Sequence, residues 1–342
     1  MKRLGVLTGG GDCPGLNPVI RAVVRRALQA NVEVIGIKNG WRGLISGEQI
    51  PLDLQAVSGI LPRGGTILGT SRTNPYKQPE DHEKTVATFK AWKLDALIAI
   101  GGEDTLGVAA KLVKEGLPIV GVPKTIDNDL AQTDFTFGFD TAVNIAMEAI
   151  DRLHTTAESH HRIMVVEVMG RHAGWIATYA GIAGGADVIL VPEHPIDVDQ
   201  VCTVIKQRHA RGKDFSIIVV AEGANFKDKE LAKTSDKVDA FGHVRLGGIG
   251  QQLSELVEKR TGFETRVTVL GHIQRGGSPT AFDRVLGTRF GVKAVELVLA
   301  GELGKMVSLQ GNRIVAVPLS EATSALKTLD PEIYNIAKIF FG

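Results

Sequence analysis

Short apolar runs recur along the chain and alternate with stretches in which apolar residues have helical spacing. The runs are rich in valine and isoleucine and nearly continuous, which is typical of strands that are buried on both faces of a sheet. We therefore expect strands at 4–7, 32–37, 96–100, 118–122, 163–168, 188–191, 216–220 and 266–270.

Helical patterns fill the intervals between these runs. Asn17 followed by Pro18 predicts an N-cap with proline at the first helical position, and apolar residues then line one face of that helix. Residues 141–155 and 249–259 are also expected to be helical, whereas the polar, charge-rich segment 225–239 predicts a surface insertion. Strands that alternate with helices indicate an α/β fold with a parallel, doubly wound sheet.

Composition narrows the class of protein. A chain of 342 residues, 44% of them hydrophobic, can form two domains or one large α/β unit. Its formal net charge of +1 gives no sign of a nucleic-acid or membrane partner. Only Cys13 and Cys202 occur, the N-terminus lacks the apolar core of a signal peptide, and no apolar run reaches membrane-spanning length. These features predict a cytoplasmic enzyme in a reducing compartment.

The segment PKTIDND, at 123–129, has two carboxylates, a hydroxyl and an ammonium group within six residues and directly follows a predicted strand. Open α/β sheets bind their ligands at the carboxyl ends of strands. In an extended segment, residues i and i+2 point the same way, so Asp127 and Asp129 are expected to face one pocket, one as general base and one holding a cation. Lys124 and Thr125 would meet an anion there. This set suits phosphoryl transfer, in which catalysis is mostly positioning and charge neutralisation.

Two glycine-rich loops also follow predicted strands. The loop at 8–15 could cradle an anion with its amides or form a tight turn, and its Cys13 is expected to be a small packing residue rather than a reactive thiol. In the second loop, Asp104 or Thr105 could simply cap the next helix. Glu103 beside two glycines favours a Mg²⁺-phosphate site, because magnesium takes one or two carboxylates and leaves room for phosphate oxygens.

Two further strand ends carry polar side chains. Arg171 lies between a buried strand and a helix, where it could form a structural salt bridge or contact an anion. In the segment 270–279, His272, Gln274 and Arg275 stand next to two glycines. A lone histidine is usually a core residue, but the three together favour an anionic, polyhydroxylated ligand.

The motifs GGGDCPGLN, GGEDT, PKTIDND, EVMGRHAGW and TVLGHIQRGGSP, in this order, resemble the phosphofructokinases over nearly the whole chain. The resemblance implies two α/β domains with mainly parallel sheets and an active site in the cleft between them. The larger domain, which would bind the phosphoryl donor, is expected at 1–138 plus 274–324. The smaller domain, which would bind the sugar phosphate, is expected at 139–273 plus 325–342.

The resemblance also implies roles for individual residues in a Mg²⁺-dependent reaction. Asp127 would deprotonate the 1-hydroxyl of fructose 6-phosphate, and Glu103 would be the magnesium-linked carboxylate, although aspartate is more usual there. Lys124, Thr125 and Arg171 would act on the phosphoryl group. The donor would be bound by Gly11, Arg72, Asp104, Thr105 and Lys124. The sugar phosphate would be bound by Thr125, Asp127, Asp129, Met169, Gly170, Arg171, Glu222, His272 and Arg275, with Arg162 and Arg266 supplied by a neighbouring subunit of a homodimer or homotetramer.

The phosphoryl donor depends on two positions. ATP-dependent members usually read GGDGS and PGTIDND, whereas Asp104 and Lys124 replace both glycines here. An aspartate adds a negative charge and a side chain against the α-phosphate of a nucleotide, and a lysine can bind the leaving phosphate of a short donor. The pair resembles the pyrophosphate-dependent branch, whose reaction is reversible. The alternative is an ATP-dependent phosphofructokinase, because lysine alone also occurs in that branch.

Two other functions are weighed against these motifs. Lipid and dinucleotide kinases also use GGDG-like loops, but the PKTIDND and GHIQRGG segments argue against that class. A catalytically inactive regulatory protein is expected to have lost Asp127 or Arg171, and both are present.

Overall fold

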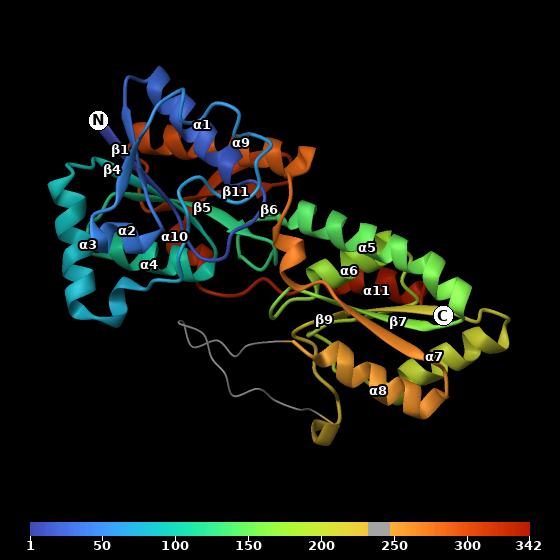
Figure 1. The fold of residues 1–342 in the computed structure, drawn as a ribbon. Helices are drawn as coiled ribbons and strands as arrows, with labels where there is room; N and C mark the ends of the chain where they lie inside the picture. Colours follow the sequence, from blue (N-terminus) through green and yellow to red (C-terminus); the bar gives the residue numbers. More distant parts are fainter. Residues whose placement is uncertain (232–246) are drawn as a thin grey trace.

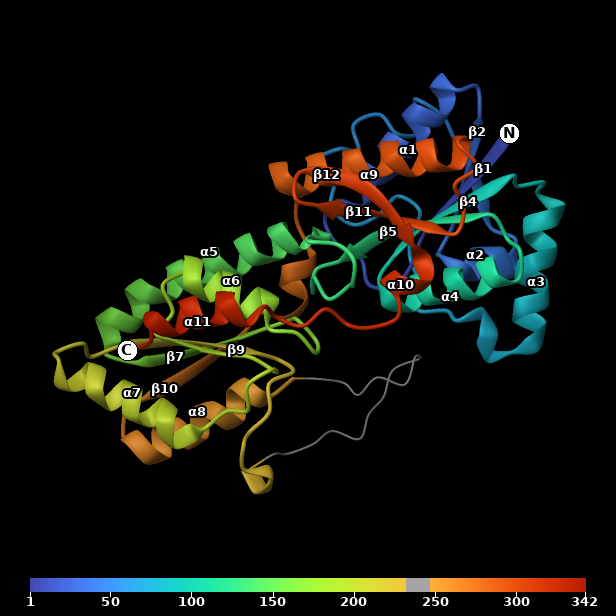
Figure 2. The ribbon, with the colours of Figure 1, turned by 180° about the vertical axis from the view of Figure 1, so that it is seen from behind.

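The computed structural model describes residues 1–231 and 247–342, in which helices pack around two separate sheets (Figure 1). The two sheets lie in different parts of an elongated molecule, and the view from behind shows the same division (Figure 2). The predicted α/β class with mainly parallel sheets is confirmed.

The larger sheet has eight strands in the order β12-β11-β5-β4-β1-β2-β3, with β6 paired to β5. Only β3 and β12, at its two edges, are antiparallel to their neighbours. The carboxyl ends of β1, β4 and β5 therefore meet at one edge of this sheet. The strands are β1 (Arg3–Thr8), β2 (Glu33–Ile37), β3 (Gln49–Leu52), β4 (Ala96–Gly101), β5 (Ile119–Thr125), β6 (Phe137–Gly138), β11 (Lys305–Gln310) and β12 (Arg313–Pro318).

The smaller sheet has four strands in the order β10-β7-β9-β8, and all its pairs are parallel. Its central strands are fully buried, as their continuous apolar sequence requires. The strands are β7 (Ile163–Val168), β8 (Val188–Leu190), β9 (Ser216–Ala221) and β10 (Thr265–Val269).

Helices cover both faces of each sheet (Figures 1 and 2). Helices α1 and α9 pack on one face of the larger sheet and α2, α3 and α4 on the other, while α5, α6 and α11 cover one face of the smaller sheet and α7 and α8 the other. No described helix is long and apolar enough to cross a bilayer. The helices are α1 (Leu16–Gln29), α2 (Trp41–Ser46), η1 (Pro75–Lys77), α3 (Pro79–Ala91), α4 (Glu103–Lys114), α5 (Phe139–His160), α6 (Trp175–Ala183), α7 (Val198–Ala210), η2 (Lys229–Leu231), α8 (Ile249–Thr261), η3 (Gly271–Arg275), α9 (Ala281–Leu299), α10 (Leu319–Ala322) and α11 (Pro331–Ile339).

All eight predicted strands are present, and the helices predicted at 141–155 and 249–259 correspond to α5 and α8. Strands β3, β6, β11 and β12 were not predicted from the sequence. β3 contains a proline and only one buried residue, and β6 has only two residues, so neither produces an apolar run. The predicted insertion at 225–239 is described only as far as residue 231, and its remainder lies outside the described residues.

The predicted N-cap at Asn17 is wrong. Helix α1 begins two residues earlier than predicted, at Leu16, and its N-cap is Gly15 in the left-handed conformation, with φ 110°. The buried Asn17 side chain instead fastens a loop: its Nδ2 donates to the carbonyl oxygen of Arg63 at 3.0 Å, and its Oδ1 accepts from the Ile67 amide at 2.9 Å. An asparagine before a proline is typical of a helix N-cap, and the sequence near Asn17 does not show that its hydrogen-bond partners lie about 50 residues further along the chain.

Candidate active site

A polar cleft lies where the carboxyl ends of β1, β4 and β5 meet the segments that follow β7 and β10. Both sheets therefore contribute to it, as expected for ligand binding in α/β folds. Carboxylates and cations line it together. Its lining residues are Gly10, Gly11, Asp12, Arg72, Gly102, Glu103, Asp104, Thr105, Lys124, Thr125, Ile126, Asp127, Asp129, Arg171 and Arg275.

The chain bends directly after β5, so the expectation of an extended segment there is wrong. Strand β5 continues through Lys124 and Thr125, and Asn128 then adopts a left-handed conformation with φ 53°. Asn128 Oδ1 accepts from the Thr136 amide at 3.1 Å and its Nδ2 donates to the Asp134 carbonyl at 3.3 Å, which holds the bend. We call residues 126–136 the base loop.

Asp127 and Asp129 nevertheless both line the cleft, and each is 4% exposed. The Asp127 amide donates to Thr125 Oγ1 at 3.0 Å. Its Oδ1 is buried without a hydrogen-bond partner among the described residues. A buried acceptor without a partner is costly unless a ligand supplies a donor, so this atom is poised to accept a proton.

Two further carboxyl groups near Asp127 have raised pKa values. Burial, followed by the negative charge of Asp127, raises the pKa of Asp129. The same two causes, in the same order, raise the pKa of Glu222 to about 7. Clusters of carboxyl groups with shifted pKa values are typical of catalytic sites.

The turn after β7 points Arg171 into this cleft. Arg171 has φ 51°, an unusual conformation for a residue other than glycine, and its amide donates to Glu222 Oε1 at 3.3 Å. The preceding Gly170 has φ 145° and accepts the Ala173 amide at 3.0 Å, which closes the turn. Backbone strain of this kind persists where the surrounding structure fixes it, often at functional sites.

On the opposite wall, Lys124 is almost fully buried and donates from Nζ to the carbonyl oxygen of Gly11 at 2.5 Å. Burial lowers the pKa of Lys124. Cys13, two residues after Gly11, is buried as expected of a packing residue, and burial raises the pKa of its thiol far above the usual range. The glycine-rich loop is thus held by the strand that carries the base loop.

Helix α4 presents Glu103 and Asp104 to the cleft in its first turn. The suggestion that Asp104 or Thr105 caps this helix is wrong, because the N-cap position belongs to Gly102. No group of three or more potential metal ligands occurs in the described part of the chain. Glu103 fits Mg²⁺ all the same, because this ion binds through one or two carboxylates and completes its shell with phosphate oxygens and water.

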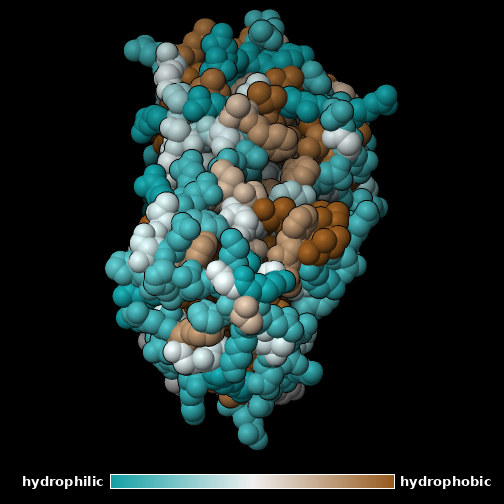
Figure 3. Space-filling view, turned by 90° about the vertical axis from the view of Figure 1, so that its right-hand side faces the viewer, coloured by the Kyte–Doolittle hydropathy of each residue, from teal (hydrophilic) through white to brown (hydrophobic). Residues whose placement is uncertain are grey.

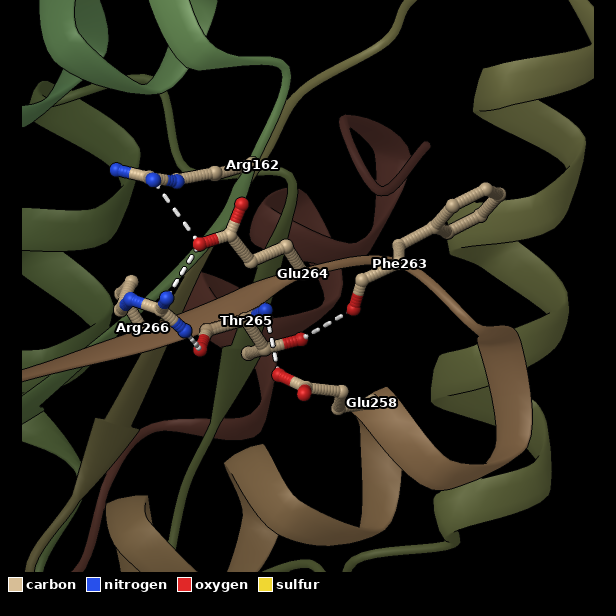
Figure 4. Close-up of polar contacts among 6 residues, drawn as sticks. All are labelled: Arg162, Glu258, Phe263, Glu264, Thr265 and Arg266. Atoms are coloured by element: carbon tan, nitrogen blue, oxygen red, sulfur yellow. Dashed lines mark hydrogen bonds and ion pairs between the residues drawn. The ribbon is translucent and has the colours of Figure 1, made fainter.

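Six of the predicted sugar-phosphate residues are not among the described residues that line the cleft, namely Arg162, Met169, Gly170, Glu222, Arg266 and His272. Arg162 and Arg266 flank the carboxylate of Glu264, with Arg162 Nη2 at 2.9 Å and Arg266 Nη2 also in hydrogen-bond contact (Figure 4). His272 is exposed on η3. Met169 and Gly170 directly precede Arg171 in the chain, and Glu222 Oε1 accepts the Arg171 amide.

Some residues of the site were not identified from the sequence. Asp12 and Ile126 line the cleft, although no role was predicted for either. Gln274, considered as a ligand contact, is completely buried, and its Oε1 accepts the Met169 amide at 2.9 Å. Asp12 could have been identified as a site residue from its position inside the glycine-rich loop. The burial of Gln274 could not have been predicted, because no neighbouring residue in the sequence indicates it.

The chain is similar to known proteins over nearly its whole length. The sequence model of the Phosphofructokinase family matches residues 3–298. A Streptomyces coelicolor protein named pyrophosphate–fructose 6-phosphate 1-phosphotransferase is 59% identical over 342 residues, covering 99% of this chain and all of the relative. A second protein of that organism, named ATP-dependent 6-phosphofructokinase 3, is 54% identical and covers 98% of this chain and 99% of the relative.

Among solved structures, Pichia pastoris phosphofructokinase in the T-state superposes with a TM-score of 0.85 at 32% identity. The match covers 99% of this chain but only 36% of that longer chain. The arrangement of the two sheets is therefore shared along the whole of the present chain.

Proposed function

The chain belongs to the phosphofructokinase family, and we propose that it transfers a phosphoryl group from pyrophosphate to the 1-hydroxyl of D-fructose 6-phosphate. The products are fructose 1,6-bisphosphate and phosphate, in a reversible step of glycolysis and gluconeogenesis. The observation that carries the choice of donor is that Asp104 and Lys124 line the same cleft as Asp127. The 59% identity to a protein named for pyrophosphate supports it.

The proposed reaction uses the atoms of the cleft directly. Asp127 takes the proton of the 1-hydroxyl on its unpartnered Oδ1. The hydroxyl oxygen forms a bond to one phosphorus of pyrophosphate, and the bridging oxygen leaves with the departing phosphate. Lys124, Thr125 and Arg171 line the cleft and stabilise the phosphoryl group in transit by charge and hydrogen bonding.

The donor is bound on the wall formed by the larger sheet, at 1–138 plus 274–324 in our domain assignment. The donor-binding residues are Gly11, Arg72, Asp104, Thr105 and Lys124. Glu103 would hold Mg²⁺, and the bound ion would neutralise charge on the phosphoryl oxygens. The carboxylate of Asp104 repels the α-phosphate of a nucleotide, which leaves pyrophosphate as the better donor.

The sugar phosphate is bound mainly by the smaller domain, at 139–273 plus 325–342. Its proposed contacts in the smaller domain are Met169, Gly170, Arg171, Glu222 and His272, and those in the larger domain are Thr125, Asp127, Asp129 and Arg275. Cationic and hydroxyl-binding side chains on this side match an anionic sugar. The two substrates therefore approach Asp127 from opposite walls.

We further propose a cytoplasmic homodimer or homotetramer in which Arg162 and Arg266 reach the sugar phosphate of a neighbouring subunit. Both arginines are partly exposed, and they lie outside the cleft lining of their own chain. Val269 and Ile273, close to Arg266 in sequence, are large apolar side chains that are 56% and 68% exposed. Hydrophobic side chains also gather within the polar surface of one face of the molecule (Figure 3).

ATP as donor is the second candidate, and the 54% identity to a protein named for ATP favours it. The deciding experiment measures formation of fructose 1,6-bisphosphate by the purified protein with Mg²⁺ and either pyrophosphate or ATP. A higher kcat/KM with pyrophosphate, together with a measurable reverse reaction from fructose 1,6-bisphosphate and phosphate, supports the proposal. Preference for ATP, or a forward reaction without a reverse one, establishes the alternative.

A further inference from the structure

The segment between α10 and α11 passes from the larger sheet to the smaller one directly beside the base loop. Leu326 forms an antiparallel bridge with Leu130. The Lys327 amide donates to the carbonyl oxygen of Asp129 at 2.8 Å. The backbone of this segment is therefore paired with the residues that immediately follow Asp127.

The side chain of Lys327 adds a second attachment to the same loop. Its Nζ donates to the carbonyl oxygens of Thr133 and Asp134, at 2.8 Å each. The Asp134 carbonyl also accepts Nδ2 of Asn128, the residue that makes the bend next to Asp127. Two of the three donors of the ammonium are thus used on the base loop.

The same lysine also contacts the smaller sheet. Nζ lies 5.0 Å from the ring centroid of Trp175, and Trp175 Nε1 donates to the Lys327 carbonyl at 3.2 Å. Trp175 is the first residue of α6, the helix that follows the turn of Arg171. Burial lowers the pKa of Lys327 to about 8, and Asp134 and Asp129 oppose that shift. The cation is therefore held between the two halves of the site.

We propose that Lys327 is a positioning residue that fixes Asp127 relative to Arg171 by joining the base loop to the first turn of α6. This inference rests on the proposed function, because Asp127 and Arg171 matter together only if one cleft performs phosphoryl transfer. Lys327 is not among the residues that line the cleft, so it acts through the loop. Apolar contacts already anchor the base loop to the larger sheet, since Ile126 and Leu130 are buried in its cores.

Loss of the ammonium should therefore move the catalytic groups without unfolding the domain. A misplacement of about 1 Å can lower turnover by roughly 10²-fold. We expect Lys327→Met to lower kcat by about 10- to 100-fold. The KM for fructose 6-phosphate should change by less than about threefold, because other proposed contacts of the sugar, namely Glu222, His272 and Arg275, lie outside the base loop. Lys327→Arg should recover most of the loss, because a guanidinium can also donate to two carbonyls and lie over an indole ring.

Lys338→Met is the matched control. Lys338 also lies over an aromatic ring, with Nζ 5.4 Å from the centroid of Tyr334, but it is exposed on α11 and outside the cleft. Hydrogen–deuterium exchange of the unliganded proteins provides a readout that needs no turnover. Lys327→Met should speed exchange within residues 126–136, and Lys338→Met should not.

Turnover is measured with both pyrophosphate and ATP and judged on whichever donor works, so a wrong donor overturns the proposed function without affecting Lys327. A selective fall in kcat with local exchange and rescue by arginine supports the positioning role. Unchanged exchange in the base loop overturns it. So does a loss of activity that accompanies faster exchange across both sheets, because Lys327 would then be only a stabilising residue.

Discussion

The guanidinium of Arg275 lies against the Cα of Gly11, so closely that a Cβ at position 11 would come within 1.7 Å of Nη1. Gly11 belongs to the loop after β1, and Arg275 ends the short helix η3 that follows β10 of the other sheet. The two walls of the cleft therefore touch where a donor and a sugar phosphate are proposed to meet. Only glycine leaves room for this contact.

Replacing Gly11 with alanine should displace Arg275. Because Arg275 is proposed to bind the sugar phosphate, the KM for fructose 6-phosphate should rise by about tenfold or more, equivalent to roughly 1.4 kcal/mol of lost binding. Gly107→Ala is a suitable control, because Gly107 lies in α4 and a Cβ there meets nothing within 4 Å. Steady-state kinetics of both variants check the prediction, and equal KM values would show that Arg275 does not bind the sugar.

Replacing Asp127 with asparagine should remove the general base while keeping its size. We expect kcat to fall by about 10²–10⁴-fold, since an amide cannot accept the hydroxyl proton. Binding of fructose 6-phosphate, measured by calorimetry, should persist. Asp151→Asn on the exposed surface of α5 controls for the substitution itself. Activity of Asp127→Asn within about threefold of wild type would remove Asp127 from the role of base.

Donor choice should follow the charge at position 104. Two like charges about 4 Å apart repel by roughly 4 kcal/mol at an effective dielectric constant near 20, and solvent and Mg²⁺ reduce that figure. Asp104→Gly should therefore raise kcat/KM for ATP, and Asp104→Asn, which removes charge but not bulk, should give a smaller gain. Lys124→Gly should weaken use of pyrophosphate without creating good use of ATP. Unchanged ATP kinetics in Asp104→Gly would contradict the charge argument.

The raised pKa of Glu222 should make the unliganded protein less stable as pH rises. The carboxyl group keeps its proton to about pH 7 in the folded chain, whereas the unfolded chain releases it near the ordinary value of 4.5. The folded state thus binds more protons between these values, so its stability falls as pH rises through this window. Glu222→Gln should gain about 2–3 kcal/mol relative to wild type between pH 5 and pH 8.

Urea denaturation of ligand-free protein at both pH values measures this difference. Glu296→Gln, an exposed site on α9, provides the matched control and should show no such gain. An equal pH dependence in wild type and Glu222→Gln would mean that Glu222 is already ionised at pH 5.

Subunit mixing should reveal whether sites are shared. If Arg162 and Arg266 serve a neighbouring subunit, Arg162→Ala subunits mixed with Asp127→Asn subunits should regain some activity, because a hybrid site then holds both intact residues. Mixing Arg162→Ala with Arg266→Ala should give no recovery, since every site would still lack one arginine. Absence of recovery in the first mixture, after subunit exchange has been demonstrated, would argue for sites built within one chain.

Features that depend on residues close together in the sequence, such as the buried strands and the loops at their ends, could be predicted. Strands buried on both faces leave continuous apolar runs, and parallel strands bring their carboxyl ends to one edge, so the loops with Gly11, Glu103 and Asp127 could be assigned to one cleft. The bend at Asn128 was not predicted, because its stabilising partners, Asp134 and Thr136, lie further along the loop.

Contacts between distant parts of the chain could not be predicted in this way. Lys327 joins Asp129 and Trp175, which are far from it in sequence, and its segment shows no motif. Asn17 looked like a helix cap for the same reason, since its true partners lie near residue 65. Whether a polar side chain is buried depends on how distant segments pack, and this packing cannot be predicted from a single sequence.

The pairing of β5 with β11 has a consequence for biosynthesis. β5 ends at Thr125, but its neighbour on one side is supplied by residues 305–310, so the strand that carries the base loop keeps an open edge until those residues have left the ribosome. Such an edge can pair with other chains. The larger unit cannot finish folding before the smaller one has been synthesised, so catalytic competence should arise only after β11 and β12 have emerged as well.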